Sequence, residues 1–327
     1  MINNTIKFSI KPEEAGKRLD LILTERIADL TRSRLKKIIE SKNVKINNKV
    51  VSSPSKKVKI DEKIIVKIIK DENTTIRPTK IKIDIVFEDN DILVINKPVG
   101  MVVHPGAGNY TNTLVNALIY KYKKKLSDIN GSLRPGIVHR IDKGTSGLLV
   151  VAKNNLAHFK LAKQFNEHSI KRKYLALVWG VIRPLKGKIE TFITRNKKNR
   201  QLMMVSEVRG KKAITNYVTQ KVYNIKDVPK ISLIECELQT GRTHQIRVHM
   251  KFKGNPLLGD KSYGKKNIKF KKIDKNFQNN LENLMGQALH AKSLGFFHPK
   301  NNKFMHFDST LPNDYKKMLD LLNKLSN

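Results

Sequence analysis

The sequence has few of the features that support disulfide, zinc or membrane chemistry. Cys236 is the only cysteine in 327 residues, which excludes an intrachain disulfide and a thiolate zinc site. No apolar run approaches the roughly eighteen residues that a membrane-spanning helix needs. The first residues, MINNTIKFSIKPEE, contain no apolar core of a signal peptide. These absences predict a soluble cytoplasmic protein that no segment anchors in a membrane.

Acidic residues are also scarce. The chain has 28 Asp and Glu against 65 Lys and Arg, giving a net charge of +37 and a pI of about 10.2. Such a charge predicts a polyanionic partner, either a nucleic acid or an anionic membrane surface. Only 14 of the 65 basic residues are arginines. Where lysine is the default cation, an arginine more often marks a site that needs a planar, bidentate donor.

Motifs for nucleotide cofactors and for serine nucleophiles are missing. Residues 143–145, KGT, contain the letters of a phosphate-binding loop in the wrong order. Gly106 and Gly108 lack the third glycine of a dinucleotide fingerprint, because Thr111 occupies its place. Ser146 lacks the two-sided glycine spacing of a nucleophile elbow. We therefore expect no cofactor and no metal.

The most informative stretch is residues 136–153, GIVHRIDKGTSGLLVVAK. Its polar middle lies between two apolar runs, which predicts a rigid loop held by two short strands. Asp142 stands between Arg140 and Lys143, which should keep its carboxylate ionised. On its own, an aspartate beside a glycine turn is more often a turn residue than a catalytic group.

Four motifs together carry a resemblance to a known family. HRIDKGTSG resembles the catalytic signature of the ribosomal large-subunit pseudouridine synthases of the RluA/RluD type. NKPVGMVVHPGAGN, residues 96–109, is similar to the segment ahead of that loop and is closest to the RluD branch. RKYLALVWG at 172–180 and TGRTHQIRVHM at 240–250 follow in the family's order. The resemblance covers roughly residues 80–310 closely and the N-terminal part more loosely.

The resemblance implies a role for each residue of a catalytic set. Asp142 would act at the sugar, either by attacking ribose C1′ or by removing a ribose proton to form a glycal. Arg247 would pair with Asp142 and orient it. Tyr174 would stack on the uracil and remove the C5 proton, provided that a nearby cation, with Arg247 as the candidate, lowers its pKa.

Other residues of these motifs are expected to bind RNA or to support the structure. Arg140 would fill the space that the flipped nucleotide leaves, or hold that nucleotide. Arg242 is interpreted as a phosphate contact or a structural residue. His244 and His249 are interpreted as packing and hydrogen-bonding groups, because no carboxylate or cysteine stands with them at metal-ligand spacing.

Residues 1–70 are expected to form a separate basic domain. They contain 18 Lys and Arg against 8 Asp and Glu, a net charge of +10. Apolar spacing predicts a helix over about 19–27 and a second one to about Ser41, capped by Thr31 or Ser33, followed by a hairpin over 44–51. This order resembles the αL RNA-binding domain named after a small-subunit ribosomal protein. The expected RNA contacts are Arg32, Arg34, Lys36 and Lys37.

Residues 71–80 are predicted to be a linker, and 81–327 a catalytic domain. The resemblance implies an α/β (α+β) pseudouridine synthase fold, a largely antiparallel mixed sheet with an RNA cleft. We further expect Asn112 to cap a helix over 113–122, a basic loop over 195–211 and a mobile surface loop over 262–286. The expected partner is large-subunit ribosomal RNA, and the expected state is a monomer.

Two other classes of protein remain compatible with the sequence. The first is a non-catalytic RNA-binding or ribosome-assembly protein, for which the charge alone would suffice. Substitution of Asp142 separates it from a synthase, because in a synthase RNA binding should survive and modification should not. An RNA hydrolase or methyltransferase is the second class. Incubation with RNA and no added cofactor separates that class from a synthase, which needs neither cofactor nor energy source.

Overall fold

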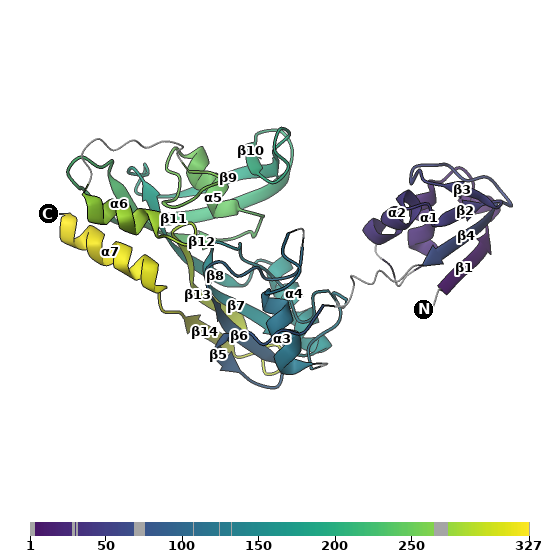
Figure 1. Ribbon diagram of the computed structural model, residues 1–327, viewed down its shortest axis with the longest axis horizontal. Helices are drawn as coiled ribbons and strands as arrows, with labels where there is room; N and C mark the ends of the chain where they lie inside the picture. The colour runs from purple at the N-terminus through teal and green to yellow at the C-terminus, as the bar shows by residue number, and fades with distance from the viewer. Residues whose placement is uncertain are drawn as a thin grey trace. The chain divides into compact units, whose positions relative to one another are not determined.

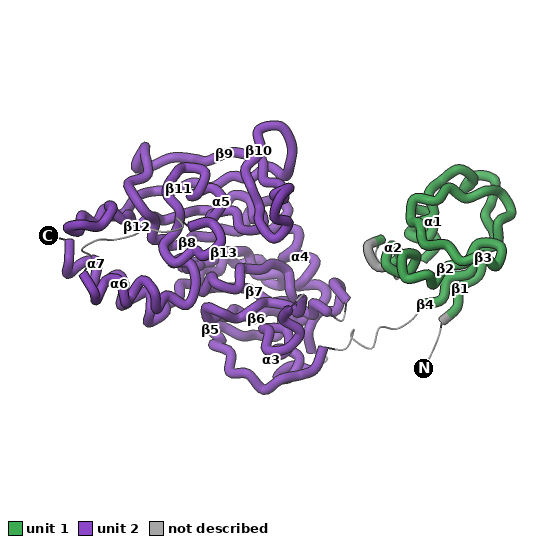
Figure 2. The backbone as a smooth tube through the Cα atoms, turned by 45° about the horizontal axis from the view of Figure 1, so that its top comes forward, with its two compact units in different colours: residues 1–74 green, residues 75–327 purple. Residues whose placement is uncertain are grey.

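The structure is a computed structural model that describes residues 4–27, 30, 32–68, 76–106, 108–123, 125–131, 133–264 and 274–326. The chain divides into two compact units, residues 1–74 and 75–327, which Figure 2 distinguishes by colour. No helix within the described ranges is both long and apolar enough to cross a membrane.

The smaller unit is a four-stranded antiparallel sheet with two helices. The strands β1 (Asn4–Ser9), β4 (Lys63–Ile68), β2 (Val44–Ile46) and β3 (Lys49–Val51) lie in that order. The helices are α1 (Leu19–Arg26) and α2 (Arg32–Glu40), and a short 3-10 turn, η1 (Pro12–Glu14), precedes them. Asn47 and Asn48 both have positive φ, as a tight hairpin turn requires. The predicted helices and hairpin are confirmed, while the predicted cap Thr31 lies outside the described residues.

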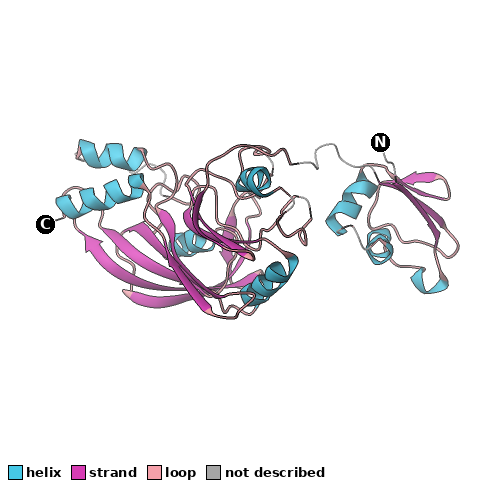
Figure 3. Ribbon diagram, turned by 90° about the horizontal axis from the view of Figure 1, so that it is seen from below, coloured by secondary structure: helices cyan, strands magenta, loops and turns pink. Residues whose placement is uncertain are grey.

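The larger unit is built on one ten-stranded sheet, whose strands are visibly twisted in Figure 3. Its order is β10-β9-β11-β12-β8-β13-β7-β6-β5, with β14 paired to β13. Within the described chain only β13 and β7 pair in parallel, so the predicted largely antiparallel mixed sheet is confirmed. The strands are β5 (Asp84–Glu88), β6 (Ile92–Lys97), β7 (Ser146–Ala152), β8 (Lys171–Trp179), β9 (Lys186–Arg195), β10 (Met203–Ser206), β11 (Lys211–Tyr223), β12 (Ile231–Leu238), β13 (Leu289–Phe297) and β14 (Phe304–Asp308).

The described part of this unit also contains the helices α3 (Leu114–Tyr122), α4 (Asn155–Asn166), α5 (Gln245–Phe252), α6 (Lys275–Glu282) and α7 (Asn313–Leu325). In Figure 1, α6 and α7 lie together at the end of the unit where the chain terminates. Strand β8 is buried on both faces. Tyr174 and Ala176 belong to one apolar core, while Leu177 and Trp179 belong to a second core that α7 completes. Strand β8 is therefore a rigid support for any side chain it presents to a site.

The loop over 139–145 leads directly into β7, whose start is fixed against β13. Ser146 and Gly147 pair with His290 and Ala291 in parallel register. Gly147 has φ +110°, and a Cβ atom there would lie 2.3 Å from the carbonyl oxygen of Ala291. Only glycine allows the two backbones to approach so closely. The C-terminal end of the loop is thereby anchored to the centre of the sheet.

Two local predictions around this region are wrong. Ile137 and Val138 do not form a strand: Ile137 makes a single bridge to Val151. The N–H of Val150, one residue earlier in β7, donates to the His139 ring. A side chain therefore takes the hydrogen bond that the backbone of a neighbouring strand would have accepted. Likewise α3 is capped by Thr113, whose hydroxyl accepts from the backbone N–H of Asn116, and not by Asn112.

The predictions for two polar segments need correction as well. The expected basic loop over 195–211 contains β10, which pairs with β9. The expected mobile loop over 262–286 contains α6, while residues 265–273 of it lie outside the described chain. Phe277 of α6 is fully buried in the second core with Leu284. One aromatic anchor and an Asp274 cap hold the helix despite the low apolar content.

Candidate active site

Asp142 lies in a turn that is held from three sides. The N–H of Thr145 donates to the Asp142 carbonyl at 3.1 Å, which closes the turn. The N–H of Gly100 donates to the Lys143 carbonyl at 2.8 Å, and the Gln287 amide donates to the Thr145 hydroxyl at 2.8 Å. The Asp142 side chain is 19 % exposed, so a ligand can reach it. The turn therefore presents one accessible carboxylate from a fixed backbone.

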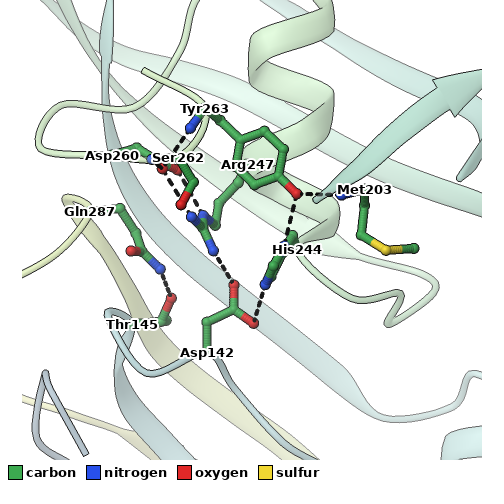
Figure 4. A network of polar contacts seen from close by, with 9 residues as sticks. All are labelled: Asp142, Thr145, Met203, His244, Arg247, Asp260, Ser262, Tyr263 and Gln287. Carbon is green, nitrogen blue, oxygen red and sulfur yellow. Dashed lines mark hydrogen bonds and ion pairs between the residues drawn. The ribbon is translucent and has the colours of Figure 1, made fainter. Parts of the chain in front are cut away.

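Arg247 joins Asp142 to a second carboxylate. Its Nη1 donates to Asp142 Oδ2 at 3.0 Å, while Nε and Nη2 donate to the two oxygens of Asp260 at 2.7 and 2.9 Å. Figure 4 shows the guanidinium between the two carboxylates. The Asp260 side chain has no exposed surface, whereas that of Asp142 remains partly open. Asp260 thus orients the arginine, and the arginine orients the accessible carboxylate.

The local sequence explains why this arrangement is rigid. Arg247 lies in the first turn of α5, and Asp260 Oδ1 accepts the backbone N–H groups of Ser262 and Tyr263. Burial opposes the negative charge of Asp260, but the hydrogen bonds with Arg247 outweigh it and lower the pKa of Asp260. Burial opposes the charge of Arg247 too, and the carboxylates of Asp260 and Asp142 outweigh it and raise its pKa. The paired charges are the stable form of this network.

His244 lies on the other side of Asp142. Its Nε2 is 3.9 Å from Asp142 Oδ1, and its Nδ1 is 2.8 Å from the Tyr263 hydroxyl. The Met203 N–H donates to that hydroxyl at 2.7 Å, so the hydroxyl proton is free to donate to Nδ1. Burial lowers the pKa of His244 and favours the neutral ring. If the hydroxyl donates to Nδ1, the neutral ring carries its proton on Nε2, the nitrogen that lies toward Asp142 in Figure 4.

Asp142 and Tyr174 line the same cavity, which has a volume of about 400 Å³. Tyr174 is 7 % exposed. Burial raises the pKa of Tyr174, and the nearby charge of Arg172 opposes that rise. The expectation that Arg247 is the cation that lowers this pKa is therefore wrong: Arg172, on the same strand, acts on the phenol, and burial outweighs it.

The other two arginines of the motifs occupy different positions. Arg140 is exposed, lines the cavity, and its Nη1 lies 3.1 Å from Nε2 of His104. Burial lowers the pKa of His104 to about 4, so the ring is neutral and accepts this bond. Arg242 donates from Nε to the Lys212 carbonyl at 2.8 Å, which ties the motif to β11.

The predicted RNA-binding residues of the smaller unit lie on α2. Arg32 is half exposed and its Nη2 lies 2.8 Å from Asp20 Oδ2. Lys36 is exposed and pairs loosely with Glu40 at 3.7 Å. Lys37 is exposed, while the side chain of Arg34 lies outside the described structure.

Sequence reasoning missed three ionisable neighbours of Asp142. Asp260 stands in LLGDKSYG, where no spacing marks a charge partner. His244 makes a hydrogen bond, as predicted, but its position beside Asp142 was not predicted. Its left-handed backbone, with φ 56°, is rare for a residue other than glycine. Lys97 is fully buried, and its ammonium donates to the carbonyls of Pro98 and Met101 at 2.7 and 2.9 Å. Burial lowers the pKa of Lys97 to about 7, and the charge of Asp142 opposes that shift.

The described part of the chain brings one set of possible metal ligands together: Asp89, Asp91 and His298. His298 Nε2 lies 2.8 Å from Asp89, and the Asn154 amide donates to Asp91 at 2.7 Å. None of the three lines the cavity that contains Asp142. These contacts connect the β5–β6 turn to its neighbours, and the cavity chemistry does not use them.

Comparison with known proteins identifies the class to which this fold and site belong. The model of the RNA pseudouridylate synthase family matches residues 91–252, and that of the S4 domain matches residues 17–64. The chain belongs to the RNA pseudouridine synthase family.

Particular relatives match nearly the whole chain. The ribosomal large subunit pseudouridine synthase D of Zymomonas mobilis is 46 % identical over 321 residues, covering 97 % of this chain and 98 % of its own. An uncharacterized RNA pseudouridine synthase of Bacillus subtilis, YlyB, is 40 % identical over 98 % of this chain and 99 % of its own. The solved structure of human RNA Pseudouridylate Synthase Domain Containing 1 is 25 % identical, with a TM-score of 0.55, over 72 % of this chain and 85 % of its own.

Proposed function

We propose that this protein converts uridines of large-subunit ribosomal RNA to pseudouridine, with Asp142 acting at the ribose. The observation that carries the assignment is the pairing of Asp142 with Arg247 at 3.0 Å in the cavity that Tyr174 also lines. The name of the Zymomonas relative supports the choice of RNA. In a family that isomerises uridine, the accessible carboxylate is the group placed to react.

The reaction moves one base without changing the composition of the RNA. The bond between uracil N1 and ribose C1′ breaks, the uracil turns, and a bond forms between C5 and C1′. The proton on C5 is lost and N1 gains one. Asp142 serves this sequence either by attacking C1′ or by removing a ribose proton, while Arg247 keeps its carboxylate oriented through Oδ2. Oδ1, which Arg247 does not hold, is the oxygen that we assign to the reaction.

Tyr174 is proposed to lie beneath the uracil and to take the C5 proton. Its support is a buried position in the same cavity and the neighbouring charge of Arg172. The target base must leave its stack, at a cost of about a few kcal/mol. An exposed cation that lines the cavity can offset this cost by stabilising the flipped state. Arg140 is such a cation, and we assign it to hold the flipped nucleotide or its vacated place.

The smaller unit and the surface charge are proposed to provide RNA affinity. The net charge of +37 provides phosphate binding that does not depend on sequence. The match of residues 17–64 to the S4 domain and the exposed Lys36 and Lys37 on α2 support a contact with structured RNA there. A protein that modifies ribosomal RNA would act in the cytoplasm.

The test is conversion of RNA in a minimal mixture. Purified protein is incubated with large-subunit ribosomal RNA made without modifications, with no cofactor added, and pseudouridines are mapped by carbodiimide-dependent reverse-transcription stops. We expect stops at defined uridines, matching those missing from cells that lack the protein. Absence of pseudouridine under these conditions, with ribosomal RNA bound, would contradict the proposed activity.

A further inference from the structure

Arg172 is a buried cation whose only part in the mechanism above is its charge beside Tyr174. It lies on β8 two residues before Tyr174, so the two side chains share a face of the strand. Both line the cavity that contains Asp142. Arg172 is 7 % exposed, the same fraction as Arg247, so the two arginines can be compared directly.

The two arginines differ in what their donors contact. Arg247 uses three N–H groups on two carboxylates. Arg172 has one long bond, from Nη2 to the Leu238 carbonyl at 3.5 Å, and its guanidinium lies 5.4 Å from the centre of the Phe165 ring. Its Nε is buried without a hydrogen-bond partner. No carboxylate in the described chain lies within ion-pair distance of it.

Neighbouring groups do not supply the missing negative charge. Burial, together with the charge of Arg172, lowers the pKa of His139 to about 3, so that ring is neutral. Burial raises the pKa of Tyr174, so the phenol also is neutral at physiological pH. An uncompensated buried guanidinium costs the free protein stability. A group kept at such a cost is best explained by a ligand that completes its hydrogen bonds.

The fold leaves space for this guanidinium. A Cβ atom built on Gly241 would lie 2.7 Å from Nη1 of Arg172. The glycine of the TGRTHQIR motif therefore serves to admit the arginine, whose end would otherwise have to move. The position of the guanidinium is built by two separate motifs, on β8 and ahead of α5.

We propose that Arg172 recognises the C4 carbonyl of the flipped uracil and so distinguishes uracil from cytosine. The proposal rests on the proposed function, because it assumes a uridine in this cavity. Arg172 offers only donors, and uracil presents an acceptor, O4, where cytosine presents an amino group. Arg172 and Tyr174 share a face of β8 and line one cavity with Asp142, so a base stacked on Tyr174 with its ribose toward Asp142 can present its far edge to the guanidinium. O4 is the carbonyl on the side of the ring away from the ribose.

The same donor serves the base before and after it turns. Rotation of uracil about the axis through N3 and C6 exchanges N1 with C5 and O2 with O4. A guanidinium that holds O4 in the substrate therefore meets O2 in the product, without moving. Its planar guanidinium, which lies over the Phe165 ring, has several donors and can therefore release one carbonyl and accept another in the same place.

A cycle of paired changes in protein and RNA tests this contact. The RNA is a synthetic stem-loop carrying one mapped target, as uridine or as 4-thiouridine, whose sulfur is a poor acceptor. Single-turnover conversion is followed by nuclease digestion and nucleoside chromatography, for the wild type and Arg172→Met. The control Arg77→Met removes an exposed cation that does not line the cavity. We expect wild type and Arg77→Met to lose roughly 10- to 100-fold with 4-thiouridine, the range of one charged hydrogen bond.

The proposal predicts that Arg172→Met loses a similar factor with uridine and loses nothing more with 4-thiouridine. The proposal would be overturned if the rate losses from Arg172→Met and from 4-thiouridine multiply. It would also be overturned if the variant converts both RNAs at the rates of the wild type. Wild-type protein that converts no uridine would instead reject the proposed function. Unfolding in urea gives a second readout: Arg172→Met should be as stable as the wild type or more stable, while Arg247→Met should be destabilised. A variant that fails to fold, or loses as much stability as Arg247→Met, would assign Arg172 a structural role and overturn the inference.

Discussion

Nη1 of Arg247 lies 3.0 Å from Oδ2 of Asp142, and the rest of the same guanidinium is held by a second, fully buried carboxylate. One planar group therefore fixes the reactive carboxylate relative to the protein core. This relationship explains why an arginine is required, because an ammonium has no fork that bonds two carboxylates in fixed directions.

The first prediction concerns that fork. Arg247→Lys keeps the charge and loses the geometry, so the single-turnover rate should fall by about 10²-fold or more. Binding to RNA, measured by filter retention, should change little because the net charge is unchanged. The matched control is Arg242→Lys, since Arg242 contacts only backbone and an amide outside the carboxylate network. If Arg242→Lys is inactive and Arg247→Lys is not, the wrong arginine of the motif has been assigned.

The second prediction concerns Asp260. Asp260→Asn removes the buried one of the two carboxylates that pair with Arg247. The free energy of unfolding should therefore fall by about 3–5 kcal/mol. Activity of the folded fraction should fall as well, because Arg247 would no longer be held toward Asp142. Asp308→Asn is the control: Asp308 is exposed, and its loss should change stability by no more than about 0.5 kcal/mol. Equal stability of the two variants in urea would contradict the account of the network.

The third prediction separates the two roles of Tyr174. Release of tritium from C5-labelled uridine should slow roughly 10²- to 10⁴-fold in Tyr174→Phe if the phenol oxygen takes the proton. Burial raises the pKa of Tyr174, so below that pKa the phenolate fraction increases tenfold per pH unit. Wild-type release should therefore rise with pH, and the rise should be absent from Tyr174→Phe. A phenylalanine variant within about threefold of the wild type, below the range of a lost general base, would leave Tyr174 as a stacking surface only.

The fourth prediction concerns the exposed cations of α2. If Lys37 contacts a phosphate, Lys37→Gln should weaken RNA binding and reduce the slope of log affinity against log salt by about 1. Lys316→Gln, on the exposed side of α7, removes the same charge elsewhere. Its salt slope should match that of the wild type. Identical slopes for both variants would place the RNA contact of the smaller unit away from this helix.

The motifs made the pair of Asp142 and Arg247 predictable, because each motif contains few other residues that could take the same role. Their 105-residue separation gives no local signal that they meet. The sheet brings the two motifs together, and this contact could be predicted only from the resemblance to a family. The same holds for Asp260, whose partner is set by the turn after α5 and not by any periodicity.

The failures of prediction have local physical causes. The lead-in to the catalytic loop has the apolar pattern of a strand, but the His139 ring takes the N–H that a strand would have paired. The segment around Phe277 is polar enough to resemble a loop, yet one buried aromatic side chain and a capped first turn form α6. Arg172 stands in a strand motif with no sequence sign of its role, because only the folded surroundings determine whether a buried charge is paired.

The most direct test of the account is Asp142→Asn, the fifth prediction. The asparagine keeps the volume and removes the charge that Arg247 holds. Purified, folded Asp142→Asn is incubated with the same unmodified ribosomal RNA, and both its affinity and its pseudouridine yield under single-turnover conditions are measured. The account predicts RNA binding close to that of the wild type and no detectable pseudouridine. Formation of pseudouridine by the folded variant at a rate near that of the wild type would contradict the assignment of Asp142 as the reacting group.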